Sequence, residues 1–138
     1  MNEVIRDIVF GEVTYKHRWL KSEKEKIVLF GQPWKINVVA SAYTGEQICE
    51  NQRNSYKYFK KNRSQLLKKI PSLLQDYLKR HVPAVTEESS HTLIRPKTLL
   101  FDRSGMIVIL CDATWDEENG IGIQLKPKFC IDVQDAFL

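Results

Sequence analysis

The chain has 138 residues, of which 43% are hydrophobic and 10% aromatic, a composition typical of a globular protein that excludes a chain disordered throughout. Because this length lies in the single-domain range and can bury a substantial core, we expect one domain over residues 1–138. Lysine and arginine (21) outnumber aspartate and glutamate (17), which gives a formal charge of +4 that biases encounters toward polyanions without identifying one.

The sequence shows no targeting signal and no metal-ligand spacing. No apolar stretch reaches the roughly 20 residues that cross a bilayer, and the first residues lack a basic leader followed by an apolar segment, so we expect a cytoplasmic protein without membrane contact. The cysteines and histidines show no paired ligand spacing: Cys49, Cys111, Cys130, His17, His81 and His91. We therefore expect no metal, no cofactor and no disulfide, and we interpret Cys111 and Cys130 as small buried hydrophobes.

Residues 4–44 have the two-residue period of β-strands. Apolar side chains alternate with polar ones over residues 13–19, and turn signals lie on both sides of the apolar run 27–30. The sequence therefore predicts an antiparallel meander of three or four strands. In this pattern His17 shares a face with Trp19, and we interpret it as a structural histidine rather than a catalytic base.

Residues 45–81 change to the period of a helix. Long and apolar side chains recur every three or four residues: Ile48, Gln52, Tyr56, Phe59, Arg63, Leu66, Ile70, Leu74, Tyr77 and Leu78. Pro71 lacks a backbone donor and disfavours a helical Ile70, so the pattern predicts either one bent helix or two helices that abut.

Lysines lie off this apolar stripe. We name five of them as possible polyanion contacts: Lys57, Lys60, Lys61, Lys68 and Lys69. Their first interpretation is a solvated helix face, and weak, non-specific contact with nucleic acid is the alternative.

The last third of the chain returns to strands. A polar connector over residues 82–92 precedes four short apolar runs, at residues 98–101, 106–111, 121–125 and 129–133. The run 106–111 is apolar on both alternating faces, so we predict that it is the central strand and that the helix covers it on one side. We expect an α+β fold in which an antiparallel sheet, made of the N-terminal meander and the C-terminal strands, packs against one long or broken amphipathic helix. The pattern leaves the strand order open.

An acidic loop follows the predicted central strand, with four carboxylates at Asp112, Asp116, Glu117 and Glu118. The pair Asn119 and Gly120 accepts positive φ, which predicts an antiparallel return of the chain. We interpret the loop first as a solvated turn in which Asp112 or Asp116 accepts hydrogen bonds from nearby backbone donors. A divalent-cation site and an anionic patch for a basic protein partner are the alternatives.

Trp115 lies within this loop. A tryptophan in such a place is either an anchor folded back onto the sheet or an exposed contact for a partner. We name Trp115, Asp116, Glu117 and Glu118 as the candidate partner-binding residues.

The segment from Trp115 to Ile123 resembles a signature of a family of small, uncharacterised bacterial proteins and domains. In that family a histidine usually stands at the position of Asn119, and a short final strand ends like residues 132–135 of this chain. Here Asn119 replaces the histidine, and residues 126–128 stand where a glycine-containing turn is commoner. Some similar proteins are candidate antitoxin or immunity proteins of bacterial competition systems, so the resemblance implies a domain that binds a partner rather than one with an assigned reaction.

The function expected from these observations is that of a non-enzymatic protein-binding module. The sequence has no glycine-rich phosphate loop, no serine elbow and no HExxH helix. We expect an immunity or antitoxin protein that binds and neutralises a cognate bacterial toxin, although the positive charge argues mildly against an inhibitor of a basic nuclease. The alternatives are a nucleic-acid-associated protein that uses the basic helix face, and a metal-binding or enzymatic protein that uses the acidic loop at residues 112–118.

Overall fold

The computed structural model describes residues 3–85 and 90–138, and the side chains of Ser90 and His91 are not described. Residues 86–89 of the predicted connector therefore lie outside the described residues. On either side of them the connector contains two short helical turns, η1 (Pro83–Val85) and α3 (Ser90–Leu93).

The N-terminal segment contains five strands, more than the three or four we predicted: β1 (Glu3–Asp7), β2 (Gly11–Tyr15), β3 (Trp19–Lys21), β4 (Glu25–Leu29) and β5 (Gln32–Ala40). The predicted alternation over residues 13–19 is not one strand, because the chain reverses at His17, which has a φ of 68°. His17 is exposed, whereas Trp19 is buried, so the prediction that the two residues share a face is wrong. Between β4 and β5 the chain turns at Phe30 and Gly31, both with positive φ, which is the backbone of a tight hairpin.

Two helices follow, α1 (Glu50–Lys68) and α2 (Ile70–His81). Cys49 begins α1, and its backbone N–H donates to the Gln52 side chain at 3.0 Å. The helices meet at Lys69, with Pro71 in the first turn of α2, where a missing backbone donor costs little. Of the two alternatives that Pro71 left open, the structure therefore has two abutting helices. None of the helices in the described residues is long and apolar enough to span a membrane.

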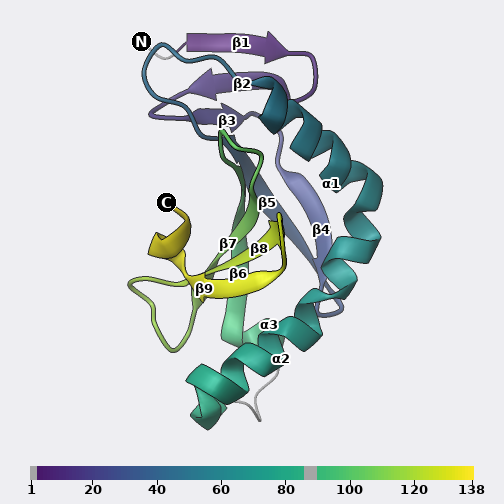
Figure 1. Cartoon of the computed structure of the whole chain (residues 1–138), viewed down its shortest axis with the longest axis vertical. Helices are drawn as coiled ribbons and strands as arrows, with labels where there is room; N and C mark the ends of the chain where they lie inside the picture. Colours follow the sequence, from purple (N-terminus) through teal and green to yellow (C-terminus); the bar gives the residue numbers. More distant parts are fainter. Residues whose placement is uncertain (1–2, 86–89) are drawn as a thin grey trace.

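The remaining strands are β6 (Ile94–Phe101), β7 (Ile107–Ala113), β8 (Ile121–Lys126) and β9 (Cys130–Val133), followed by the helical turn η2 (Gln134–Phe137). The four predicted C-terminal strands are thus confirmed. Among the described residues the nine strands form one sheet in the order β1-β2-β3-β5-β6-β7-β8-β9, with β4 paired to β5 outside this path (Figure 1). The predicted central strand β7 lies between β6 and β8.

The sheet is mostly antiparallel, as expected for this α+β fold. One pair, β5 with β6, is parallel, because α1 and α2 carry the chain from the end of one strand back to the start of the next. Figure 1 shows α1 running along one side of the sheet, and α2 beyond its lower end.

Apolar side chains lie on both faces of the sheet. Those facing the helices form the main core, in which Tyr56, Phe59 and Leu74 from α1 and α2 pack with strand residues such as Ile109. The opposite face carries a smaller cluster, made by Val39, Leu100, Val108 and Leu110, with Leu20, Met106 and Phe137 packed against it. This second face is covered in part by η2, which leaves room for a groove beside it.

Candidate functional site

The acidic loop joins β7 to β8 over residues 114–120 and is held by its own hydrogen bonds. The Asp116 carboxylate accepts from the backbone N–H of Asn119 at 3.3 Å and from the Asn119 side-chain amide at 3.1 and 3.2 Å. The Gly120 N–H donates to the Asp116 carbonyl at 2.9 Å, and Gly120 has the positive φ we predicted, 64°. The connection is longer than a two-residue turn. Asp116 accepts hydrogen bonds from within the loop, as expected if the loop is a solvated turn.

The other predicted loop residues separate into a packed side chain and two exposed ones. Trp115 is half-buried and packs against the main core, which favours the anchor interpretation over the exposed contact. Glu117 and Glu118 are exposed, and neither carboxylate has a hydrogen bond or ion pair within the described residues. Asp112 forms an ion pair with Lys97 at 3.4 Å. Among the side chains that the structure describes, which exclude His91, no group of three or more potential ligands is placed to hold a metal ion.

The five lysines named from the sequence differ in their surroundings. Lys57, Lys61 and Lys68 are exposed and share a side of α1 at helical spacing. The Lys60 ammonium lies 4.1 Å from the centre of the Tyr56 ring, and burial lowers the pKa of Lys60. The Lys69 ammonium lies 5.1 Å from the centre of the Phe129 ring.

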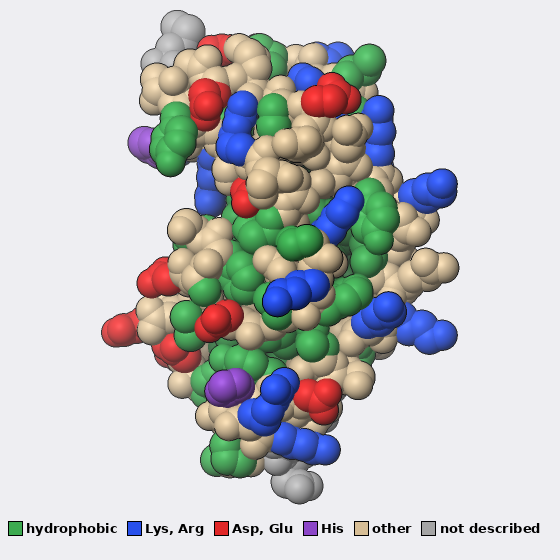
Figure 2. All heavy atoms as spheres, in the orientation of Figure 1, with side chains coloured by type: hydrophobic (Ala, Val, Ile, Leu, Met, Phe, Trp, Pro, Cys, Tyr) green, Lys and Arg blue, Asp and Glu red, His purple; other side chains and the backbone are tan. Residues whose placement is uncertain are grey.

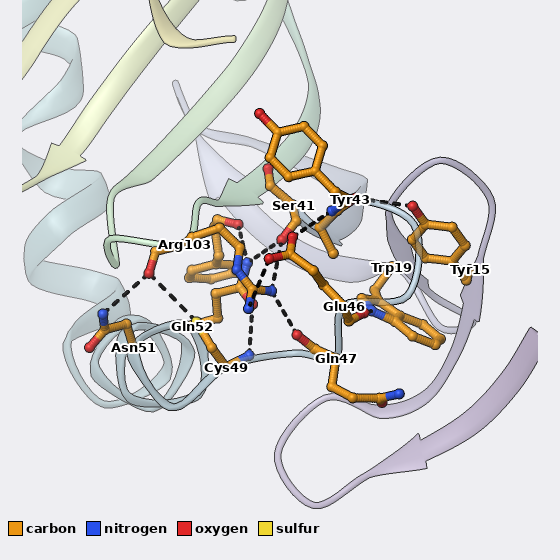
Figure 3. Close-up of polar contacts among 12 residues, drawn as sticks. Tyr15, Trp19, Ser41, Tyr43, Glu46, Gln47, Cys49, Asn51, Gln52 and Arg103 are labelled. Atoms are coloured by element: carbon orange, nitrogen blue, oxygen red, sulfur yellow. Dashed lines mark hydrogen bonds and ion pairs between the residues drawn. The ribbon is translucent and has the colours of Figure 1, made fainter.

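The structure also reveals a site that the sequence did not suggest, the loop at residues 41–49 that connects β5 to α1. At its tip Tyr43 is 82% exposed, and its ring points away from the polar contacts below it (Figure 3). The Tyr43 N–H donates to the Glu46 carboxylate at 2.7 Å, and the Glu46 N–H donates to the Tyr43 carbonyl at 2.9 Å. The turn that carries Tyr43 is therefore closed by two hydrogen bonds.

Side chains of β2 and β3 hold the loop from one side. The Tyr15 hydroxyl donates to the Ala42 carbonyl at 3.2 Å, and the Trp19 indole donates to the Glu46 carbonyl at 2.9 Å. These bonds lie on either side of Tyr43 in the sequence, so they fix both ends of the exposed turn.

Arg103 and Gln52 hold the loop from the other side. Arg103, in the turn between β6 and β7, donates to the Gln47 carbonyl at 2.6 Å and the Ser41 carbonyl at 3.5 Å. The buried Gln52 amide of α1 donates to the Ser41 carbonyl at 2.7 Å and the Phe101 carbonyl at 3.1 Å. Figure 3 shows these contacts converging on the loop from β2 and β3, α1 and the β6–β7 turn. Tyr43 is thus exposed on a rigid support.

A groove of about 680 Å³ lies beside this loop, on the second face of the sheet. Leu100, Met106 and Phe137 line its apolar part. Its rim is polar: His17, Arg18, Tyr43, Glu46 and Arg103. The arrangement is an apolar floor with an exposed aromatic ring and charged side chains at the edge, a composition that protein interfaces often have.

The turn at residues 16–18 adds positive charge to this rim. Lys16, His17 and Arg18 are exposed, and none of the three side chains has a hydrogen bond or an ion pair within the described residues. By contrast, Glu46 pairs with Arg103 at 3.9 Å, and Asp102 accepts hydrogen bonds from its own turn. The groove therefore has at its edge one cation, Arg18, without an ion pair in the described residues, while Glu46 and Asp102 are engaged.

Sequence analysis missed this site because its parts are far apart in the chain. The one local signal was an aromatic residue followed by glycine within a polar turn, at residues 43–46. That signal marks a turn and does not reveal whether the aromatic ring is buried.

Comparison with curated proteins and with solved structures found no match to this chain. A family model described as "Domain of unknown function (DUF6985)" matches residues 9–136. The matched region begins before β2 and ends in η2, so it includes the acidic loop, the Tyr43 loop and the groove. The chain therefore belongs to the DUF6985 family.

Proposed function

We propose that this protein is a non-enzymatic protein-binding module, of the immunity or antitoxin type, that binds and neutralises a cognate bacterial toxin. The observation that carries the proposal is Tyr43, whose side chain is 82% exposed on a loop held by hydrogen bonds from three parts of the fold. An exposed tyrosine contributes large contact area and has few rotatable bonds to immobilise. A rigid support lowers the entropy lost on binding still further.

The groove beside Tyr43 supplies the second element of a binding surface. The groove offers apolar surface next to the tyrosine, from Leu100, Met106 and Phe137. Burial of an apolar side chain of the partner there would lower the free energy of the complex. Met106 is unbranched and adapts its shape to what it contacts. In protein interfaces, the few residues that contribute most of the binding energy are often aromatic and lie beside apolar pockets.

The acidic loop adjoins this surface through the C-terminal helical turn. The N–H of Gln134 donates to the Gly120 carbonyl at 3.4 Å, and Phe137 of the same turn lines the groove. Figure 2 shows acidic side chains gathered over the β7–β8 loop, on the left flank below the C terminus. Glu117 and Glu118 are therefore proposed as charged contacts at the edge of the interface, where charge mainly speeds encounter.

The metal-binding or enzymatic alternative receives less support from the loop. Asp116 is the least exposed of its carboxylates, and its oxygens accept from Asn119. A metal ion there would compete with the hydrogen bonds that hold the loop. The observation thus favours a supporting role for Asp116.

The test is co-expression with a candidate toxin domain encoded next to the gene. Wild-type protein should rescue growth, and Tyr43→Ala should rescue poorly and weaken the measured Kd by about 30-fold or more, as for a central aromatic contact. Ile8→Ser is the matched control, because Ile8 is 92% exposed in the β1–β2 turn, on a different part of the surface. We expect this variant to behave as wild type.

Two results would contradict the proposal. If the wild-type protein neither rescues growth nor binds the neighbouring toxin domain, the immunity function is wrong. If the wild type rescues growth but Tyr43→Ala does so equally well, the function stands and the Tyr43 surface is not its interface.

A further inference from the structure

We propose that a second surface, formed by α1 and the β8–β9 turn, binds single-stranded nucleic acid. This surface, called the lysine face below, contains six lysines and two aromatic rings: Lys57, Lys61, Lys68, Lys69, Lys126, Lys128, Tyr58 and Phe129. It does not include the Tyr43 loop or the groove, and the proposal does not depend on the immunity function.

Tertiary structure brings the two parts of the lysine face together. The Lys126 ammonium, at the end of β8, lies 4.4 Å from the centre of the Tyr58 ring on α1. The Lys69 ammonium, where α1 ends, lies 5.1 Å from the centre of the Phe129 ring, in the turn before β9. Cations and rings therefore alternate across the junction of the helix and the turn.

The charge of the lysine face is uncompensated. The ion pairs of the described residues use Arg53, Arg63, Lys97 and Arg103 as their cations, and none uses a lysine of this face. Figure 2 shows Lys and Arg side chains along the flank over α1 and beside the apolar surface next to it. A polyanion that lies along this face releases counterions and neutralises the repulsion among the lysines.

The aromatic rings distinguish nucleic acid from other polyanions. Tyr58 is 39% exposed, and Phe129 is half-buried beside Lys69. Stacking on such a ring requires a base that is not already stacked within a duplex, so the combination of lysines and rings fits a single strand. Lysines alone would contact duplex and single strand through phosphates without this preference.

The experiment uses the purified full chain and an oligo(dT) of about 12 nucleotides with a fluorescent label, followed by anisotropy over a range of KCl concentrations. The slope of log K against log salt should fall in magnitude by about 0.7 for each phosphate contact removed. Lys61→Gln and Lys128→Gln should therefore each reduce the slope, while Lys16→Gln, in the turn between β2 and β3, should not change it.

Stacking is measured separately with Tyr58→Leu, which retains an apolar side chain for packing. This variant should weaken binding by about 5-fold or more with an unchanged salt slope, whereas Tyr43→Leu should bind as wild type. A DNA duplex of the same sequence should bind more weakly than oligo(dT), and poly-glutamate should compete poorly.

Several results would overturn the proposal. Absence of binding at low salt removes it outright, provided that the wild-type chain shows its normal thermal unfolding. If duplex and single strand bind equally and Tyr58→Leu has no effect, the lysine face attracts polyanions in general and does not stack bases. Poly-glutamate that competes as well as unlabelled oligo(dT) identifies the lysine face as a surface for an acidic protein. None of these results bears on growth rescue by the Tyr43 surface, so the two proposals fail independently.

Discussion

The ring of Phe137 lies on Gly122, in the space that a β-carbon at position 122 would occupy. Gly122 is in β8 and Phe137 in the C-terminal helical turn, so this contact seats the turn on the second face of the sheet. There Phe137 packs against the cluster that includes Leu100 and Val108. The same ring is one wall of the groove beside Tyr43, which links the shape of the groove to a missing side chain.

Gly122→Ala should lower the free energy of unfolding by about 1–3 kcal/mol, because the added methyl group displaces the Phe137 ring. Phe137→Ala alone should also destabilise the protein, since it uncovers apolar surface. In the double variant the methyl group has no ring to displace. Adding Gly122→Ala to Phe137→Ala should therefore cause little further loss of unfolding free energy. Urea unfolding of the four proteins measures this coupling, and additive effects would show that the contact does not seat the turn.

Gly120→Val should destabilise the protein by about 1–3 kcal/mol, because Gly120 has positive φ and a β-carbon there would overlap the Cys111 carbonyl. Glu118→Gln, in the same loop, should change stability by less than about 0.5 kcal/mol, since the Glu118 side chain is exposed and has no partner among the described residues. Thermal unfolding compares the two variants. Equal, small effects would mean that the loop tolerates a side chain at its return.

Asp7 should make stability depend on pH in the acid range. Burial acts to raise the pKa of this carboxyl, but the hydrogen bonds from Arg53, from the Phe10 N–H and from the Val9 N–H outweigh it and hold the pKa below 3.8. A carboxyl group whose pKa is lower in the folded than in the unfolded protein stabilises the fold at pH values above its unfolded pKa. This stabilisation is lost as the pH falls through the folded pKa. Wild-type stability should therefore decrease below about pH 4.

Asp7→Asn tests this account. The variant should lose about 1–3 kcal/mol at neutral pH, because Arg53 and the two backbone donors lose their anionic acceptor. Its stability should then change less than that of the wild type between about pH 5 and pH 3. Urea unfolding at several pH values measures both effects, and parallel curves for the two proteins would assign the acid sensitivity to other carboxylates.

Trp115→Ala should lower the free energy of unfolding by about 1–3 kcal/mol, because this partly buried side chain packs against the main core. Trp115→Phe should restore most of the loss by keeping an apolar ring in place. Thermal unfolding of the isolated wild-type and variant proteins measures these differences in stability. A Trp115→Ala protein as stable as the wild type would return Trp115 to the exposed-contact interpretation.

Charge reversal at Glu117 and Glu118 should act on association with a protein partner. Both carboxylates are exposed at the rim of the loop, where charge changes the rate of encounter more than the rate of dissociation. Glu117→Lys with Glu118→Lys should therefore slow association, and the difference from wild type should shrink as salt is added. Surface plasmon resonance with the proposed toxin partner measures both rates, and a change confined to dissociation would place these residues inside the interface.

Local patterns predicted most of the secondary structure. The four C-terminal strands and the break near Pro71 follow from apolar periodicity and from the missing proline donor, which act within a few residues. The positive φ of Gly120 likewise followed from the Asn119 and Gly120 pair. Each of these predictions depended on neighbours in the sequence and did not require knowledge of the fold.

The prediction of one strand over residues 13–19 is wrong because a local pattern contains no information on tertiary pairing. Alternation there is compatible with one strand, but the chain reverses at His17 because Trp19 pairs with Tyr15 and also with Ala40 of β5. A pairing with a strand about 20 residues away is a tertiary interaction, and it outweighs the local preference against positive φ at a non-glycine residue.

The sequence by itself determined the α+β class, the helical middle, the C-terminal strands and the acidic loop, because these depend on interactions between near neighbours. Only the tertiary structure decided which side chains those elements expose at the surface. It packed Trp115 and left Tyr43 exposed, since burial depends on which distant surfaces cover a side chain. It also placed Lys126 over Tyr58 and Arg103 against the Tyr43 loop, contacts that exist only once the strand order brings distant segments together.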